Sequence, residues 1–221
     1  MKIIISGYGK IGKLLCRELS FHDLLILDPK YSKVNIVSIV DEYDLIIDFS
    51  NRAAIYDICE YMKNHKNTKL IIGTTGYDEK ENRLIDEIAL DHVVVKDSNY
   101  SYSMHIYKKI VSYLNDFDLS SFEITLKETH NVSKRDSPSG TSYSIIKRLY
   151  RYFVEIISIR NHTKKSGVHV LEFKDKNGSI CLIHEAKNRM MFVDGVIKTI
   201  DKITSLNNGL YILNSIKLFK K

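Results

Sequence analysis

The feature that most constrains this chain is a glycine turn set between a short apolar run and an amphipathic run. Residues 2–6 read Lys-Ile-Ile-Ile-Ser, and leucines at helical spacing follow the turn as far as Leu19. In such a strand–turn–helix unit, the first two glycines permit a tight turn whose backbone N–H groups approach a pyrophosphate, and the third lets the helix pack on the strand. The motif alone is weak evidence, but with its flanking strand and helix it predicts dinucleotide binding. The six residues of the turn are Gly7, Tyr8, Gly9, Lys10, Ile11 and Gly12.

The next apolar run, residues 24–27, ends in Asp28. A carboxylate about 20 residues beyond the first glycine is expected to hold the ribose hydroxyls of NADH, although an acidic residue at a strand end is also a common turn former. Lys30 lies two residues further and could instead meet the 2′-phosphate of NADPH. The sequence therefore predicts NADH or NADPH as the cofactor, with NADH favoured.

Apolar runs and amphipathic helical patterns continue through the first half of the chain. Near-continuous apolar strands alternating with such helices predict a parallel sheet covered on both faces. The expected strands are residues 35–40, 44–49, 69–72 and 92–95, and the expected helices are residues 53–63 and 79–90.

Polar residues collect where these strands end, which is the edge at which a parallel sheet binds its ligands. Each of these loops taken singly could be an ordinary turn, since Gly and Thr are common in turns. Three of them on one edge predict cofactor contacts. The residues we assign to the cofactor in these loops are Phe49, Gly73, Thr74, Thr75, Ser98, Asn99 and Tyr100.

The stretch from Glu128 to Thr141 is a polar loop delivered by the alternating run 122–127. Pro138 excludes a helix before it, and a helical pattern opens directly after Ser139. A helix N-terminus with cations beside it favours an anionic guest. His130 and Lys134 therefore indicate a proton donor beside a carboxylate clamp, whereas a solvated surface turn is the alternative for a charged loop.

The remainder of the second half predicts a helix, an antiparallel or mixed sheet and two closing helices. Asp175-Lys176-Asn177-Gly178 separates two alternating runs, and Asn-Gly is a strong hairpin signal. The expected helices are residues 102–114, 193–203 and 210–219, and the expected hairpin strands are residues 168–173 and 179–183.

Composition narrows the class of protein. The net charge is +6 and the pI is near 9.0, but the lysines are spread among acidic residues, so we expect no nucleic-acid partner. Cys16, Cys59 and Cys181 lie far apart in apolar-periodic segments and are expected to be buried, reduced thiols. The histidines show no metal-ligand spacing, so no metal is expected. No run approaches the roughly 18 apolar residues of a membrane span, which favours a cytoplasmic protein.

Taken together, these motifs resemble those of the dihydrodipicolinate reductase family, and the resemblance spans the chain. The long central motif E-T-H-N-x-x-K-x-D-x-P-S-G-T, preceded by G-T-T-G in the right order, is highly specific. The other matching segments are Gly7–Gly12, Asp48-Phe49-Ser50, Asn99-Tyr100-Ser101, His184-x-Ala186-x-x-Arg189 and Met191-Phe192-x-x-Gly195.

The resemblance implies a Rossmann-like parallel-sheet domain plus an α+β substrate and oligomerisation domain with an open mixed sheet. It places the first domain at residues 1–101 with 192–221 and the second at residues 102–191. The implied assembly is a homo-oligomer, either a tetramer or a dimer. The implied reaction is the reduction of 4-hydroxy-tetrahydrodipicolinate, a small dicarboxylate, by NADH or NADPH in the diaminopimelate route of lysine biosynthesis.

The resemblance also implies roles for single residues. His130 would handle a proton and Lys134 would bind a substrate carboxylate and help in protonation. The other substrate-binding residues would be Asn131, Gly140, Thr141 and Thr75. His184 and Arg189 would either contact substrate or pin the return of the chain to the first domain.

The chain departs from the family pattern in two places. Asn131 stands where the family commonly has a second histidine, and it can donate a hydrogen bond but cannot carry charge. The sheet between Gly167 and His184 is also shorter than is usual in the family, which bears on the tetramer more than on the chemistry. These departures leave open a degenerate NADH-binding module without turnover. An aspartate dehydrogenase-like reductase is a second alternative, which would explain the glycine turn but not the Ser-Gly-Thr loop.

Overall fold

The computed structural model describes residues 1–162, 167–213 and 215–216. The chain divides into two compact units, which are described separately. Unit 1 comprises Met1–Tyr100 with Phe192–Lys221, and unit 2 comprises Ser101–Met191.

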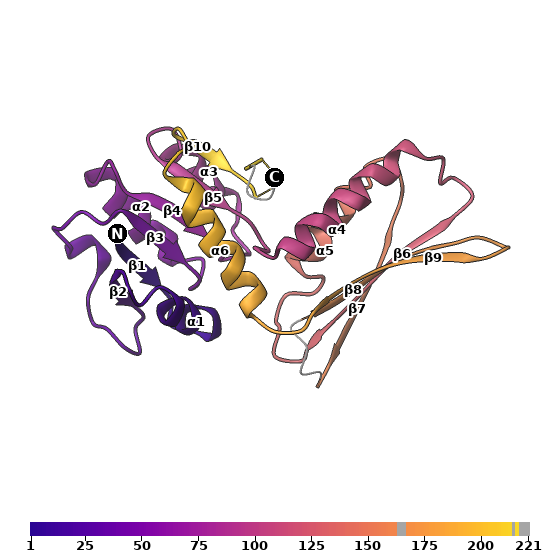
Figure 1. Cartoon of the computed structure of the whole chain (residues 1–221), viewed down its shortest axis with the longest axis horizontal. Helices are drawn as coiled ribbons and strands as arrows, with labels where there is room; N and C mark the ends of the chain where they lie inside the picture. The colour runs from indigo at the N-terminus through magenta and orange to yellow at the C-terminus, as the bar shows by residue number, and fades with distance from the viewer. Residues whose placement is uncertain (163–166, 214, 217–221) are drawn as a thin grey trace. The chain divides into compact units, whose positions relative to one another are not determined.

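Unit 1 is built on a six-stranded sheet in the order β10-β5-β4-β3-β1-β2, and each of its strand pairs is parallel (Figure 1). The strand order reverses at β1, so β2 lies on one side of β1 and β3 on the other. Such a switch point opens a crevice at the carboxyl ends of the strands. The strands are β1 (Lys2–Ser6), β2 (Asp23–Leu27), β3 (Leu45–Asp48), β4 (Lys69–Ile72), β5 (Val93–Lys96) and β10 (Gly209–Tyr211).

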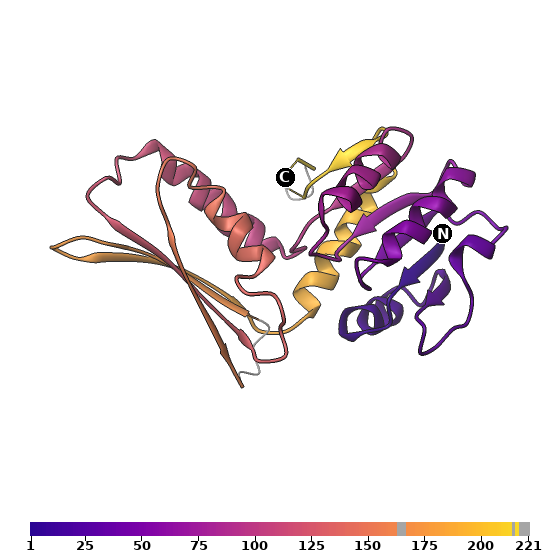
Figure 2. The ribbon, with the colours of Figure 1, turned by 180° about the vertical axis from the view of Figure 1, so that it is seen from behind.

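Helices cover both faces of this sheet, as its continuous apolar strands predict. Helices α2 (Ala54–Asn64) and α3 (Glu79–Ile88) pack in one buried cluster with alternate strand residues such as Ile46 and Leu70. Figures 1 and 2 show α1 (Lys10–Glu18) and α6 (Met190–Ile203) on the opposite face. The predicted parallel sheet covered on both faces is therefore confirmed.

Unit 2 is a four-stranded mixed sheet in the order β7-β6-β8-β9, with α4 (Tyr102–Tyr113) and α5 (Gly140–Ile146) side by side over one face (Figure 1). Strand β6 pairs with β7 in parallel and with β8 antiparallel. The predicted hairpin joins β8 to β9. The strands are β6 (Glu123–Asn131), β7 (Glu155–Asn161), β8 (Gly167–Lys174) and β9 (Ser179–Ala186), and a 3₁₀ turn, η2 (Leu114–Asp116), follows α4.

Three sequence predictions about secondary structure are wrong or incomplete. Residues 35–40 form no strand, because the Asn35 side chain accepts a hydrogen bond from Val37 N–H and caps the 3₁₀ turn η1 (Ile36–Ser38). Residues 209–211 extend the sheet of unit 1 as β10 beside β5, although 210–219 was predicted as helix; residues 214 and 217–219 of that range lie outside the described residues. Strand β7 was not predicted at all.

The prediction that all three cysteines are buried is also wrong. Each is a free thiol, as predicted, and Cys59 is buried. However, Cys16 is only partly buried and Cys181 is exposed. Cys181 lies in β9, which is an edge strand of the unit 2 sheet and has a neighbour on one side only.

Candidate active site

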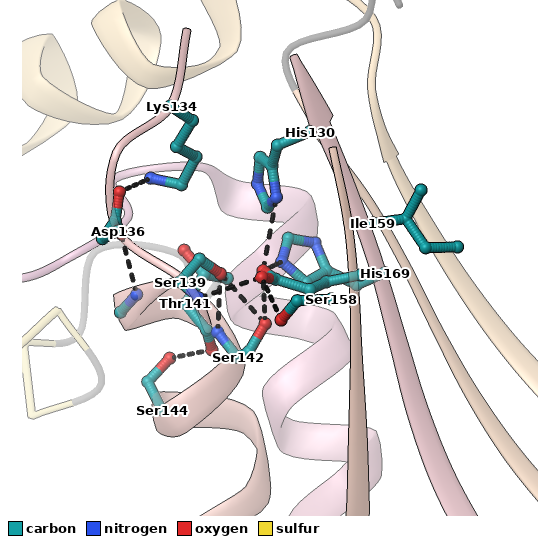
Figure 3. Close-up of polar contacts among 12 residues, drawn as sticks. His130, Lys134, Asp136, Ser139, Thr141, Ser142, Ser144, Ser158, Ile159 and His169 are labelled. Carbon is teal, nitrogen blue, oxygen red and sulfur yellow. Dashed lines mark hydrogen bonds and ion pairs between the residues drawn. The ribbon is translucent and has the colours of Figure 1, made fainter. Parts of the chain in front are cut away.

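The predicted proton donor lies in a buried polar row that crosses the sheet of unit 2. Glu128 in β6 is in register with Ser158 of β7 and His169 of β8, and His169 is in register with His184 of β9. His130 stands two residues beyond Glu128 and so points to the same face, which α4 and α5 cover. Glu128, His130, His169 and His184 are all buried. Strand register therefore gathers an anion and three imidazoles, although His169 and His184 lie far from Glu128 in the sequence. Figure 3 shows His130 and His169.

Glu128 is the centre of this row, and its carboxylate is fully buried. Its Oε1 atom accepts hydrogen bonds from Ser139 N–H at 3.1 Å, Ser158 Oγ at 2.9 Å and Arg160 Nη2 at 2.9 Å, and its Oε2 atom accepts one from Ser142 Oγ at 2.8 Å. Burial alone would raise the pKa of this carboxyl, but the hydrogen bonds and the guanidinium outweigh burial and hold the pKa far below its usual range. Glu128 is therefore an anion at neutral pH.

Two imidazoles face the second oxygen of this anion. His130 Nδ1 lies 3.3 Å from Glu128 Oε2, and His169 Nε2 lies 4.0 Å from the same atom. Burial, and then the charges of His130 and His184, lower the pKa of His169 to about 3. His169 is therefore neutral at neutral pH. The third imidazole, His184, contacts α4 instead, because its Nε2 lies 2.9 Å from Ser103 Oγ.

Glu128, His130 and His169 also have the residue types of a metal site, and their ligand atoms lie within 4.8 Å of one another. Sequence spacing could not indicate this group, because His169 lies on a different strand. The carboxylate, however, is already bound by the guanidinium of Arg160. A divalent cation here would place a second positive charge beside a buried one. The group fits a structural anion between imidazoles better than a metal centre.

The predicted carboxylate clamp lies in the loop after β6. Lys134 Nζ is 2.7 Å from Asp136 Oδ1, and Asp136 Oδ2 accepts a 3.3 Å hydrogen bond from Gly140 N–H (Figure 3). Burial raises the pKa of Asp136, but the hydrogen bond and charge of Lys134 outweigh it, so the pKa is lowered overall. A carboxylate of the chain itself thus binds two groups that the sequence assigned to a substrate carboxylate.

The remaining residues that were predicted to contact substrate fall in four places. Thr141 is buried in the first turn of α5. Asn131 ends β6, and its Oδ1 atom accepts a hydrogen bond from Ser133 N–H at 3.0 Å. Thr75 belongs to unit 1 and is exposed in the loop after β4. Arg189 is partly buried immediately before α6.

A cavity of about 800 Å³ opens in unit 1 at the switch point of the sheet. It is lined by the ends of β1, β2 and β3, including Gly7, Gly9, Asp28 and Phe49. Gly7 has φ 94°, and a Cβ there would lie 2.6 Å from the Phe49 carbonyl oxygen, so this position requires glycine. A Cβ at Gly9 would meet nothing within 4 Å, which leaves the turn open to a ligand. The cavity and its glycine turn fit a dinucleotide.

Asp28 lies directly after β2, where the sequence predicts a carboxylate that binds ribose, and it also stabilises the glycine turn. Its carboxylate accepts hydrogen bonds from Tyr8 N–H at 2.8 Å and Lys30 N–H at 2.9 Å, and these backbone donors lower its pKa. Asp28 is therefore ionised. It fixes the glycine turn while one side of its carboxylate lines the cavity.

The other predicted cofactor residues are less closely grouped. Gly12 is buried within α1, where a Cβ would lie 2.0 Å from the Gly7 carbonyl oxygen, so it serves packing. Gly73 packs against the Phe49 ring, and Thr74 Oγ1 accepts a hydrogen bond from Ser50 N–H. Tyr100 is buried, with its hydroxyl 2.9 Å from the Ile72 carbonyl oxygen, so its side chain braces the sheet. Lys10, Ile11, Thr74, Thr75, Ser98, Asn99 and Tyr100 are not among the residues that line the cavity.

Sequence reasoning missed Glu128, Arg160 and His169 as members of the site. A signal for Glu128 was present, because Glu128 and His130 share the face of the alternating strand that also carries buried Leu126. Arg160 lies on the strand that was not predicted, so no local pattern pointed to it.

Comparison with known proteins agrees with these two units. A parallel sheet with a glycine turn and a cavity at its switch point is typical of NAD(P)-dependent oxidoreductases. Family models described as the N-terminus and the C-terminus of dihydrodipicolinate reductase match residues 1–100 and 101–216. The chain belongs to the dihydrodipicolinate reductase family, as its motifs predict.

Individual relatives are similar over almost the whole chain. The 4-hydroxy-tetrahydrodipicolinate reductase of Staphylococcus haemolyticus is 28% identical, with 98% of this chain and 100% of the relative covered. That of Rickettsia canadensis is 27% identical, with 98% of each covered. Among solved structures, dipicolinate-bound dihydrodipicolinate reductase from Paenisporosarcina sp. TG-14 has a TM-score of 0.73 at 17% identity, covering 98% of this chain and 99% of that one.

A more distant likeness concerns the fold alone. Aspartate dehydrogenase from Thermotoga maritima has a TM-score of 0.52 at 15% identity, covering 92% of this chain and 96% of that one.

The described part of the chain contains no helix with the length and apolar character needed to span a bilayer.

Proposed function

We propose that this protein reduces 4-hydroxy-tetrahydrodipicolinate to tetrahydrodipicolinate with NAD(P)H, in the diaminopimelate route of lysine biosynthesis. The observation that carries the proposal is the pair formed by buried His130 and ionised Glu128, in a strand whose following loop carries Lys134. Reduction with loss of water requires a hydride at a ring carbon and a proton delivered near it. A bound nicotinamide supplies the hydride.

The residues of unit 2 supply the polar part of this chemistry. His130 delivers the proton, because imidazole is the side chain that most often serves as a general acid or base. Lys134, Gly140 and Thr141 bind a carboxylate of the doubly negative ring through an ammonium group, a backbone N–H and a hydroxyl. Asn131 adds a neutral hydrogen-bonding group of the same unit, and substrate contact by Thr75, in unit 1, stays a prediction.

For the cofactor, the arrangement of Asp28 supports NADH over NADPH. Its ionised carboxylate lines the cavity at the end of β2, where it can accept hydrogen bonds from ribose hydroxyls and would repel a 2′-phosphate. Lys33 also lines the cavity and Lys30 follows Asp28, so NADPH has nearby cations and is expected to bind too.

The assay that tests the function follows NAD(P)H oxidation by the purified chain. We expect oxidation when the product of the preceding synthase is supplied, and a higher kcat/KM with NADH than with NADPH. Omission of that substrate is the control. Oxidation with oxaloacetate and ammonia in its place would support an aspartate dehydrogenase-like enzyme. Binding of NADH without turnover of either substrate would identify a degenerate module.

We also propose that second copies of this chain cover the open face of the unit 2 sheet. That face carries Ile157 and Ile183, which are 38% and 64% exposed, with Lys127 and Val170 between them in register. Sedimentation equilibrium is expected to give a tetramer or a dimer, and Ile183→Lys is expected to lower the oligomer order. A wild-type monomer at micromolar concentration would contradict the proposed assembly.

A cytoplasmic location of the protein stays a prediction.

A further inference from the structure

The two oxygens of the Glu128 carboxylate face different kinds of partner. Oε1 accepts three hydrogen bonds, one each from Ser139 N–H, Ser158 Oγ and Arg160 Nη2. Oε2 accepts one hydrogen bond, from Ser142 Oγ, and also lies 3.3 Å from His130 Nδ1. The carboxylate is therefore anchored through one oxygen and directed at the imidazole through the other.

This asymmetry determines which nitrogen of His130 exchanges a proton. At 3.3 Å, Nδ1 does not have good hydrogen-bond geometry to Oε2, but the anion still favours the tautomer with a proton on Nδ1, because the lone pair of the other tautomer would face a carboxylate that can only accept. In neutral His130 the lone pair is then on Nε2, and the proton that the imidazole gains and delivers sits on that atom. Nε2 lies against Gly167, where a Cβ would be 2.6 Å away, so the absence of a side chain at 167 leaves room for it.

We propose that Glu128 is a positioning residue for the reaction: it fixes His130 as the Nδ1–H tautomer, so that Nε2 carries the reactive proton. The proposal rests on the proposed function, in which His130 is the proton donor. Arg160 offsets the negative charge of Glu128 and also helps to hold its carboxylate in position. Its Nη2 also donates to the Asp136 carbonyl oxygen at 2.5 Å, which ties the anion to the loop that carries Lys134.

The other groups that contact the Glu128 carboxylate come from three neighbouring elements. Ser139 and Ser142 come from the start of α5, Ser158 and Arg160 from β7, and His169 from β8. Of these, Arg160 is the only full positive charge that contacts the carboxylate among the described residues. An uncharged His169, 4.0 Å from Oε2, leaves Nδ1 of His130 as the nearer donor.

The test is Glu128→Gln, because the structure dictates how the new amide must lie. Three donors converge on the Oε1 position, so the amide oxygen must occupy it and the NH₂ group must take the Oε2 position. The NH₂ group can donate to Ser142 Oγ and would then face His130 Nδ1, which must become the acceptor. We therefore expect the neutral imidazole to switch to the Nε2–H tautomer, as measured by ¹⁵N chemical shifts of labelled protein.

In the assay, Glu128→Gln is expected to lower kcat by roughly 10²- to 10⁴-fold, the range for a catalytic histidine held in the wrong tautomer or lost as an acid. KM for the substrate is expected to stay within a few-fold, since Lys134 and Gly140 are unchanged. Glu123→Gln is the matched control. It removes an exposed carboxylate from the same strand and should change neither the ¹⁵N shifts of His130 nor kcat.

Two further measurements keep the proposal open to refutation. If Glu128→Gln does not fold, Glu128→Asp keeps the charge but draws it back by one methylene, and a mixture of tautomers with a smaller loss of kcat is expected. The tautomer is read without substrate, so it remains informative even if the wild type shows no turnover. Retention of Nδ1–H in Glu128→Gln would overturn the proposal, as would loss of wild-type activity on chelation and its return with Zn²⁺, which would indicate a bound cation.

Discussion

His130→Gln is expected to lower kcat by roughly 10²-fold or more while leaving the Kd of NADH unchanged. The glutamine NH₂ group can still donate to Glu128 Oε2, so the buried carboxylate keeps a partner. The amide cannot take up and release a proton at neutral pH, however, so the acid step is lost. Cofactor affinity is expected to be unaffected, because the cavity that fits a dinucleotide lies in unit 1. Steady-state kinetics and NADH fluorescence titration measure the two quantities.

The control for this variant is His162→Gln, which changes an exposed histidine of the same unit just beyond β7. Its kinetics should match those of the wild type. A His130→Gln enzyme with wild-type kcat would show that another group delivers the proton. An equal loss of kcat and of NADH affinity would indicate general misfolding instead, and a thermal melt would identify that case.

The fold of unit 1 could be predicted because short, contiguous stretches of sequence determine its strands and helices. Apolar runs such as residues 2–6 and 69–72 can only be satisfied inside a sheet covered on both faces. Where prediction failed, a partner distant in the sequence or a cap decided the outcome. Residues 209–211 become a strand because the edge of β5 offers them hydrogen bonds, and the Asn35 side chain turns an apolar run into a 3₁₀ turn.

The site could be predicted only in part, for a related reason. The loop from Glu128 to Thr141 is contiguous, so His130 and Lys134 stand out from their neighbours. The partners that give His130 its surroundings reach it across the sheet, at positions set by strand register. Thus His169 and Arg160 lie 39 and 30 residues beyond His130 in sequence, yet both contact Glu128. No local pattern specifies register over such separations.

The loop that carries Lys134 has a property that the sequence did not predict. The carboxylate of Asp136 accepts from Lys134 Nζ and from Gly140 N–H, two donors that the proposed function assigns to the substrate. Asp136 thus fixes the positions of both donors. A substrate carboxylate must share these donors with Asp136 or displace it.

Lys134→Ala is expected to lower kcat/KM by about 10- to 100-fold, with both kcat and KM affected. A hydrogen bond to a charged group contributes about 1.5–3 kcal/mol, and each 1.4 kcal/mol is a factor of ten. The ammonium binds the substrate carboxylate in the ground state and in the transition state, so both kcat and KM should change. Lys176→Ala, in the exposed turn between β8 and β9, is the control and should have little effect.

Lys134→Ala combined with Asp136→Asn is expected to recover part of that loss. Once the lysine is gone, the carboxylate of Asp136 is an unpaired anion at a site that must accept a doubly negative ring, and the asparagine removes this repulsion while keeping an acceptor for Gly140 N–H. In the wild-type background, Asp136→Asn should instead cost activity, because it releases Lys134 from its position. The two opposite signs define a coupling energy in a double-mutant cycle. Additive effects of the two substitutions on kcat/KM would show that Asp136 and Lys134 act independently, and that the ion pair between them does not organise the substrate site.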